Sequence, residues 1–250
     1  MTDFLDTAMI FAAGRGERMR PLTDHCPKPL LEAGGKPLIV HQIERLAAAG
    51  FTTIVINHAW LGTQIEAALG DGARWGVRLR YSPEHEALET AGGIAQALPL
   101  LSGADASDVP DSSRSRVFVA VSGDVYCDFD YASLRERAAA MARLDTPGLH
   151  LVMVPNPPFH PQGDFALGAD GRLSLDARDA ATPRDTFGNI GLYDTRMFAG
   201  LPRGTRRALT PYYRDAIAAG LATGERYTGL WKNVGTPAQL AELDARLRGA

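Results

Sequence analysis

Short apolar runs alternate with helical patterns along the first half of the chain. Residues 9–13, 53–56 and 77–81 have the length and the apolar or β-branched character of buried strands. Two helical faces separate these runs, one made of Ile39, Ile43, Leu46 and Ala47 and the other of Leu61, Ile65 and Leu69. An order of strand, helix, strand, helix and strand predicts right-handed crossovers and a parallel sheet.

The second half is richer in strands than in helices. Strands are expected in five segments separated by turns rich in Pro, Gly and Asp, at 117–121, 149–154, 165–167, 173–175 and 187–193. Asp170 and Gly171 fit ordinary hairpin chemistry. Thr236 and Pro237 form a standard helix start. The predicted fold class is α/β, a Rossmann-like mixed, mostly parallel sheet with helices on both faces.

The composition fits one domain of this class. With 250 residues, 45% of them hydrophobic and 22% charged, the chain can bury a full core as a single domain. Residues 102–116 are rich in Ser, Asp and Gly without an apolar period, which predicts an exposed loop.

Charge and hydropathy exclude several classes of partner. A formal net charge of -3 gives no field that would gather nucleic acid or an anionic membrane. The sequence has no apolar run long enough to span a bilayer, and its first six residues are acidic rather than signal-like. We therefore expect a cytoplasmic protein. The sequence does not specify its oligomeric state.

The two cysteines indicate no metal site. Cys26 and Cys127 are far apart in sequence and fit no metal-ligand spacing, so reduced thiols are expected. A catalytic role for Cys26 is conceivable, but a partly buried bystander is favoured because nothing nearby supplies a general base.

The segment after the first strand has the chemistry of a phosphate-binding loop. Gly14 and Gly16 let the backbone turn sharply, so that its N–H groups can point at an anion. Arg15 and Arg18 add forked donors suited to phosphate oxygens, and the prolines on both sides of Lys28 limit where its ammonium can go. A tight turn with solvated arginines is the alternative. The segment matches neither the dinucleotide fingerprint nor the P-loop.

Taken in order, this segment closely resembles the signature of sugar-1-phosphate nucleotidylyltransferases. The match comprises the two glycines, Arg18, Pro-Leu-Thr at 21–23 and Pro-Lys-Pro-Leu at 27–30. The resemblance implies that a nucleoside triphosphate and a sugar 1-phosphate react with release of pyrophosphate, with Mg²⁺ as cofactor. It further implies a nucleotide-binding half at 8–125 and a half at 126–250 that binds the sugar and carries the C-terminal helix.

Two positions resemble the metal ligands of this family. Asp124 follows a buried strand where the family has its metal-binding Gly-Asp, and Mg²⁺ prefers one or two carboxylates plus substrate oxygens. A helix cap or a turn residue is the alternative for this aspartate. Near its end the chain has Asn233 where the family usually has an aspartate in Trp-x-Asp-x-Gly-Thr-Pro. An amide oxygen can coordinate a hard cation but adds no charge.

The resemblance also assigns roles to other positions. Arg18, with Arg15 nearby, would hold the β- and γ-phosphates, and Lys28 would stabilise charge around the α-phosphate. The nucleotide would also contact Ala12, Ala13, Gly14, Gly16, Asn57, Glu89, Thr90, Gly92 and Gly93. The sugar candidates are Asp164, Asn189 and Gly191, with Arg178, Arg184 or Lys232 replacing a lysine common in the family. The paired glycines would open a helix whose amino end accepts an oxygen-rich ligand, although a plain helix capped by Thr90 explains the same residues.

Four segments resemble one branch of the family, the N-acetylmuramate-1-phosphate uridylyltransferases. They are residues 57–62, 81–84, 88–90 and 163–165. The resemblance implies that UTP is used to make a UDP-sugar in peptidoglycan recycling. Within the same architecture, mannose, glucose or choline phosphate could be activated with GTP, dTTP or CTP. From another class, Asn233 leaves open a catalytically silent nucleotide-sugar sensor, although Arg18, Lys28 and Asp124 argue against silence. A Rossmann dehydrogenase is a weaker alternative, because in this chain no acidic ribose ligand follows the glycine loop at the proper distance.

Overall fold

The computed structural model describes residues 6–102, 117–176 and 183–249. Apart from its first residue, the exposed loop expected at 102–116 lies outside these ranges. No helix within them is both long and apolar enough to cross a bilayer.

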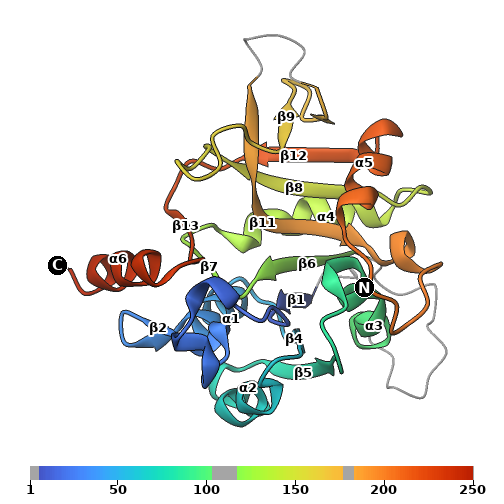
Figure 1. The fold of residues 1–250 in the computed structure, drawn as a ribbon. Coiled ribbons are helices and arrows are strands. Elements are labelled where there is room, and N and C mark those ends of the chain that lie inside the picture. The colour runs from blue at the N-terminus through green and yellow to red at the C-terminus, as the bar shows by residue number, and fades with distance from the viewer. Residues whose placement is uncertain (1–5, 103–116, 177–182, 250) are drawn as a thin grey trace.

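One sheet runs through both halves of the chain (Figure 1). Within the described residues it has nine strands, in the order β10-β9-β11-β6-β1-β4-β5, and β8 pairs with β11 and β12. The strands are β1 (Thr7–Phe11), β4 (Thr53–His58), β5 (Arg78–Pro83), β6 (Val117–Ser122), β8 (Leu149–Val154), β9 (Phe165–Leu167), β10 (Leu173–Ser174), β11 (Arg184–Asp194) and β12 (Ala222–Arg226).

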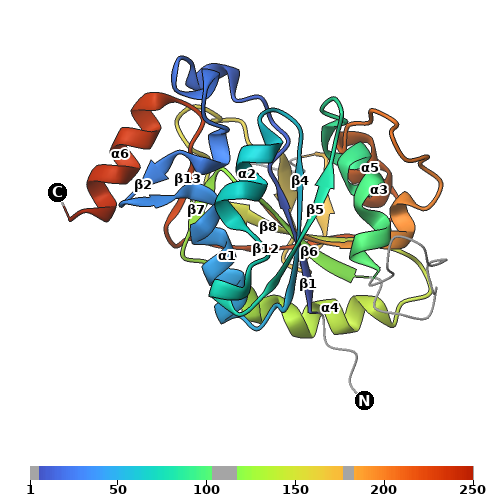
Figure 2. The ribbon, with the colours of Figure 1, turned by 90° about the horizontal axis from the view of Figure 1, so that it is seen from below.

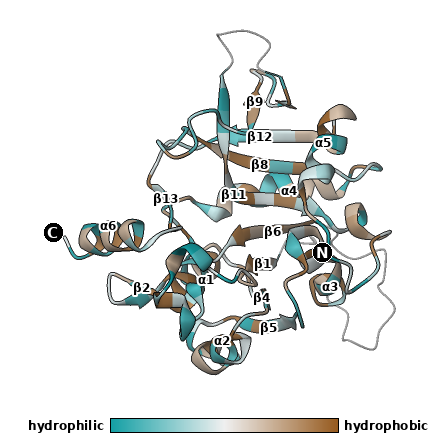
Figure 3. Cartoon of the chain, viewed as in Figure 1, coloured by the Kyte–Doolittle hydropathy of each residue, from teal (hydrophilic) through white to brown (hydrophobic). Residues whose placement is uncertain are grey.

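The strands of the first half are parallel. β1 pairs in parallel with β4 and β6, and β4 pairs in parallel with β5, as the alternating pattern predicts. Their apolar runs are buried because helices cover both faces of the sheet. In Figure 3, β6 is accordingly hydrophobic along most of its length.

The second half extends the sheet with mixed pairing. β11 is antiparallel to β6 and to β8, whereas β12 is parallel to β8. The hairpin expected around Asp170 and Gly171 is confirmed, because it joins the antiparallel strands β9 and β10. Strand β12 and the two helices at Leu134–Ala142 and Thr210–Ala218 were not predicted.

Two apolar clusters lie on opposite faces of the sheet. Ile10 points to the face that α1, α2 and α4 cover, and Met9 points to the face that α3 and α5 cover. The helices are α1 (Leu38–Ala48), α2 (Gly62–Leu69), α3 (Glu89–Leu101), α4 (Leu134–Ala142) and α5 (Thr210–Ala218). The predicted arrangement of helices on both faces is confirmed.

The C-terminal segment returns to the first half of the chain. There β13 (Trp231–Asn233) pairs antiparallel with β7 (Val125–Cys127). Helix α6 (Pro237–Leu247) follows, with Thr236 as the expected N-cap, and lies beside the small hairpin of β2 (Glu32–Ala33) and β3 (Lys36–Pro37) (Figure 2). Because of this return, residues from both ends of the chain meet at one edge of the sheet.

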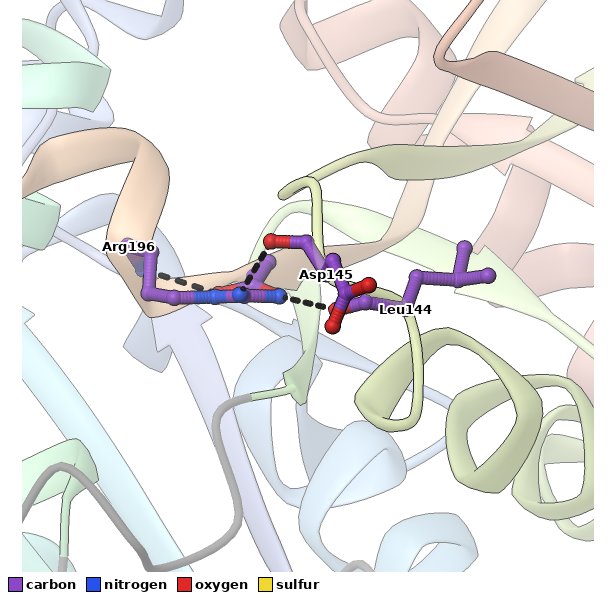
Figure 4. A network of polar contacts seen from close by, with 4 residues as sticks. Leu144, Asp145 and Arg196 are labelled. Carbon is purple, nitrogen blue, oxygen red and sulfur yellow. Dashed lines mark hydrogen bonds and ion pairs between the residues drawn. The ribbon is translucent and has the colours of Figure 1, made fainter.

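Arg196 ties the end of β11 to the connection between α4 and β8 (Figure 4). Its guanidinium donates to the buried carboxylate of Asp194 and to the backbone carbonyls of Leu144 and Asp145, both at 2.8 Å. The Asp194 contacts raise the pKa of Arg196 above its usual value. With its donors used in this way, Arg196 serves the fold rather than a ligand.

Candidate active site

A first cavity of about 530 Å³ opens at the carboxyl ends of β1, β4 and β6. This is the edge at which open α/β sheets bind ligands. Most residues expected to contact the nucleotide line it together: Ala12, Ala13, Gly14, Arg15, Gly16, Arg18, Lys28, Asn57, Glu89, Thr90 and Asp124. We call it the nucleotide cavity.

The loop after β1 is folded tightly enough to require glycine at position 16. Gly16 has φ +71°, and a Cβ there would lie 3.1 Å from Lys28 Cβ. The Thr23 hydroxyl donates to the Gly16 carbonyl at 2.8 Å. Three short 3-10 turns follow, η1 (Glu17–Met19), η2 (Leu22–Asp24) and η3 (Lys28–Leu30). The loop therefore packs against Lys28 and helps to place its side chain.

Lys28 forms an ion pair with Asp124 across the nucleotide cavity. Lys28 lies on η3 and Asp124 directly follows β6, so the pair joins the signature loop to a strand end. The side chains are 11% and 27% exposed. The ammonium thus neutralises the carboxylate while keeping access to ligands in the cavity.

Arg15 and Arg18 sit in different surroundings. The Arg15 guanidinium stacks 3.3 Å from the ring centre of Trp60, and its buried Nη1 has no hydrogen-bond partner. The Trp60 indole donates to the Thr23 carbonyl at 3.1 Å. Arg18 is exposed beside Gly235, where an added Cβ would lie 3.3 Å from its Nη2. Arg15 is held in place by stacking, whereas Arg18 is free to follow an anion.

A buried hydrogen-bond chain supports the floor of the cavity. Asn57 accepts from the Ala12 N–H at 3.1 Å and donates to Glu84 at 2.6 Å. The other carboxylate oxygen of Glu84 accepts from the Leu88 N–H at 2.8 Å. Burial raises the pKa of Glu84 against the opposing effect of these two donors. Sequence reasoning gave Glu84 no role, although it lies in a segment that resembles the family.

The start of α3 differs from the expected capped helix. Leu88 is the N-cap residue and Thr90 makes no side-chain cap, so the alternative in which Thr90 caps the helix is wrong. Glu89 instead has φ 60° and pairs with Arg206 at 3.1 Å. The Gly92 N–H donates to the Arg207 carbonyl, and the Arg207 N–H donates to the Leu88 carbonyl. These two backbone hydrogen bonds hold Arg207 against the start of the helix and take the place of a side-chain cap.

The paired glycines serve close packing beneath the cavity. An added Cβ at Gly93 would lie 2.7 Å from the side chains of Asn57 and Glu84, and one at Gly92 would lie 2.3 Å from the Thr205 carbonyl. Neither glycine is among the residues that line the nucleotide cavity. Their effect on a ligand is indirect, because they allow Asn57, Glu84 and the Thr205 backbone to pack closely against the helix.

A second cavity of about 760 Å³ is formed by the second half of the chain. Asp164 and Asn189, the expected sugar contacts, both line it. The Asp164 carboxylate accepts from the Phe187 N–H at 2.7 Å and lies 3.1 Å from the His160 ring. Gly191 is inside the sheet instead, opposite Ala120 on β6. We call this space the acceptor cavity.

The three residues expected to replace the family's sugar-phosphate lysine differ in where the structure places them. Arg184 lines the acceptor cavity and donates to the Leu175 carbonyl. Lys232 pairs with Glu242 of α6 at 2.6 Å and is not among the residues lining either cavity. Arg178 lies outside the described residues. Arg214 of α5 also lines the acceptor cavity, and the sequence gave no signal for it.

The two metal-ligand candidates lie where the cavities approach each other. Asp124 lines the nucleotide cavity and Asn233 lines the acceptor cavity. The Val234 N–H donates to the Asp124 carbonyl at 2.9 Å, which keeps the two segments together. The buried Asn233 Oδ1 has no hydrogen-bond partner. This orphaned oxygen and the carboxylate fit an oxygen-preferring cation, although the described residues contain no cluster of three acidic, His or Cys ligands.

Cys26 has the environment of a bystander thiol. Its Sγ contacts the Pro27 carbonyl, and burial, reinforced by Glu32, raises the pKa of the thiol. A raised pKa disfavours the reactive thiolate.

Comparisons with known proteins agree with this geometry. A family model described as nucleotidyl transferase matches residues 7–158. The chain is 47% identical to the N-acetylmuramate alpha-1-phosphate uridylyltransferase of Neisseria meningitidis, over 97% of this chain and 98% of the relative. It is 34% identical to the protein of the same name from Caulobacter vibrioides, over 97% of each. A solved structure from Bacillus anthracis, assigned as a glucose-1-phosphate thymidylyltransferase, matches with TM-score 0.73 and 22% identity over 98% of this chain and 96% of that chain, so the fold is shared.

Proposed function

Since this chain belongs to the nucleotidyl transferase family, we propose that it transfers the uridylyl group of UTP to N-acetylmuramate 1-phosphate. The products are UDP-N-acetylmuramate and pyrophosphate. The observation that carries the proposal is the convergence of Lys28, Arg15, Arg18 and Asp124 on one cavity, beside a second cavity large enough for a sugar. The choice of base and sugar rests on similarity to the two named relatives along almost the whole chain.

The reaction needs no protein nucleophile. An oxygen of the sugar phosphate attacks the α-phosphorus of UTP and forms a new P–O bond. The bond between the α-phosphorus and the bridging oxygen breaks, and its electron pair leaves with pyrophosphate. Because both reactants are anions, the protein must hold them in line and offset their repulsion.

The cations of the nucleotide cavity are suited to this task. Lys28 exchanges its contact with Asp124 for the α-phosphate and stabilises the charge that develops there. Arg18 is exposed at the cavity and receives the β- and γ-phosphates, while Arg15 offers an unpartnered donor next to them. Asn57 links the backbone of Ala12 to Glu84 and keeps this part of the cavity in place.

Mg²⁺ is proposed as the cofactor, with Asp124 and Asn233 as its protein ligands. When bound, the ion supplies positive charge to phosphate oxygens. Once Lys28 has moved to the α-phosphate, the Asp124 carboxylate is available to the ion and provides the only negative charge of these two ligands. Asn233 contributes its unpartnered amide oxygen. We further propose that the reaction takes place in the cytoplasm, where the UDP-sugar would serve peptidoglycan recycling.

Pyrophosphate release tests the proposal directly. The protein is incubated with N-acetylmuramate 1-phosphate and each of the four common nucleoside triphosphates, with Mg²⁺ or with excess chelator. We expect turnover with UTP and Mg²⁺ at least tenfold above every other combination, a threshold that corresponds to about 1.4 kcal/mol. Turnover only with another sugar phosphate would refute the acceptor, and turnover only with another nucleotide would refute the base.

A further inference from the structure

N-acetylmuramate 1-phosphate carries two acidic groups at different places on its ring. It differs from N-acetylglucosamine 1-phosphate by a lactyl ether, which adds a carboxylate away from the phosphate. An enzyme that selects this acceptor needs a cation for that second anion, because a buried or half-buried carboxylate requires a charged or hydrogen-bonding partner. The inference drawn from this need rests on the proposed function.

The acceptor cavity has lining residues both beside the nucleotide cavity and on helix α5. One part is lined by Asn233, whose segment is bonded to Asp124 of the nucleotide cavity. Another part is lined by Arg214 of α5, a helix that packs against β10 and β12. The phosphate must stay near the nucleotide to react, which leaves the part of the cavity beside α5 for the lactyl group.

The charged groups of the acceptor cavity differ in what they already bind. Asp164 accepts from Phe187 and His160, and Arg184 donates to the Leu175 carbonyl. Among the described residues, the Arg214 side chain makes no hydrogen bond or ion pair, although it lines the same cavity as Asp176. Of the two arginines that line this cavity among the described residues, Arg214 is therefore the one whose guanidinium donors are all available.

The helix that carries Arg214 is firmly anchored beside the cavity. The neighbouring Tyr213 is buried and its hydroxyl lies 2.9 Å from that of Tyr193. Its ring also packs edge-on against Phe165 and Phe187, with ring centres 5.7 and 5.5 Å apart. This anchoring fixes the backbone of α5, so that Arg214 is presented to the cavity at little entropic cost on binding.

We propose that Arg214 binds the lactyl carboxylate of the acceptor and so selects N-acetylmuramate 1-phosphate over N-acetylglucosamine 1-phosphate. A guanidinium can hold a carboxylate through two parallel hydrogen bonds. The contact forms with the bound acceptor and is remote from the reacting phosphorus. It should therefore act on KM for the acceptor and not on kcat.

The test compares Arg214→Ala and Arg214→Lys with the wild type on both sugar phosphates. We expect Arg214→Ala to raise KM for N-acetylmuramate 1-phosphate roughly tenfold, and Arg214→Lys to recover part of that loss. The KM, or the inhibition constant if it is not turned over, of N-acetylglucosamine 1-phosphate should stay within about twofold, since no carboxylate is lost to it. Arg137→Ala is the control, because this exposed arginine lies on α4, across the sheet from α5.

A neutral analogue of the acceptor separates loss of the lactyl contact from a general change in the fold of the variant. In the amide of N-acetylmuramate 1-phosphate the lactyl carboxylate is uncharged. The wild type should bind this amide roughly tenfold more weakly than the acid, whereas Arg214→Ala should bind the two about equally. An equal loss on both sugar phosphates, or no loss on the acid, would overturn the proposal.

Arg184→Ala distinguishes the two arginines of the cavity. If this variant rather than Arg214→Ala shows the loss specific to the lactyl group, the assignment to Arg214 is wrong. If the wild type does not use N-acetylmuramate 1-phosphate at all, the proposed function has failed. If the wild type uses it and Arg214→Ala does not discriminate, only the present inference has failed.

Discussion

The nucleotide cavity and the acceptor cavity are built in different ways. The nucleotide cavity takes most of its lining from one continuous loop after β1 and from the ends of β4 and β6. The acceptor cavity takes its lining from five separate parts of the second half, around residues 159–165, 175–176, 184–189, 210–214 and 231–233. The nucleotide cavity is thus formed mainly by one loop, whereas the acceptor cavity is formed by side chains from segments that are distant in sequence.

Because of this difference, we expect the nucleotide cavity to determine the rate of the reaction and the acceptor cavity to determine which sugar phosphate is used. A continuous loop locked by Gly16 and Lys28 presents the same cations to any nucleoside triphosphate that enters. Side chains on separate elements can change one at a time without disturbing that loop. Substitutions in the nucleotide cavity should therefore reduce turnover with every acceptor, whereas substitutions in the acceptor cavity should change which acceptor is used.

The largest effect is expected from Lys28→Ala. Removal of this ammonium leaves Asp124 without its partner and the α-phosphate without its cation, so kcat should fall about a hundredfold or more, measured as pyrophosphate release. The melting temperature should change little because the side chain belongs to a loop. Lys36→Ala is the control, since Lys36 pairs only with Glu44 on the surface. Near-normal turnover of Lys28→Ala would contradict its role.

A smaller effect, on nucleotide binding, is expected from Glu84→Gln. Glutamine has one acceptor oxygen, so it cannot accept from both Asn57 and Leu88 as the carboxylate does. KM for UTP should rise about tenfold, while KM for the sugar phosphate stays unchanged. The exposed Glu86 supplies the matched control, Glu86→Gln. A rise in both KM values would show that Glu84 supports the two cavities alike.

At the boundary between the cavities, Asn233→Asp should lower the Mg²⁺ requirement. The substitution adds a charge where an unpartnered amide oxygen stands beside the Asp124 segment. The Mg²⁺ concentration for half-maximal activity should fall about three- to tenfold, as charge on the ligands increases affinity for hard cations. Wild-type protein titrated in parallel gives the reference. An unchanged requirement would remove Asn233 from the metal site.

The smallest effect on activity is expected from Tyr213→Phe, which tests the anchor of the acceptor cavity. Loss of the hydroxyl contact with Tyr193 should lower the free energy of unfolding by about 1 kcal/mol at pH 7, with kcat unchanged. Burial, with Tyr193 beside it, raises the pKa of Tyr213 well above its ordinary value near 10. The folded state thus holds this proton more tightly, and stability present below pH 10 is lost as the pH rises above it.

Denaturant unfolding between pH 8 and 11 measures this alkaline loss. The loss should be smaller in Tyr213→Phe because one buried hydroxyl is gone. An equally steep loss in the variant would mean that other groups dominate the alkaline unfolding.

The features that could be predicted from the sequence are those encoded by residues at consecutive positions. The parallel strands of the first half and the family are confirmed, because buried strands and the loop around Gly16 and Lys28 each occupy consecutive positions. The apolar face predicted for α1 is also confirmed, since Ile39, Ile43 and Leu46 are buried.

What was missed depends on tertiary contacts. Glu84 acquires its role only when β5, β4 and the start of α3 come together. The alternative of a Thr90 cap is wrong, and the backbone of Arg207, more than a hundred residues later in the chain, holds that helix end instead. Arg214 lies on a helix that was not predicted from the sequence, and no local motif places it in a cavity.

The pairing of β6 with β11 fixes how the two substrates can meet. Ile190 lies opposite Val121 and Asp194 opposite Val117, so a continuous antiparallel ladder joins the two halves. A ladder of this kind resists bending within its plane, and it leaves no flexible linker about which the halves could rotate. The spacing between the two cavities is therefore set by the strand repeat of this shared sheet rather than by the angle of a hinge.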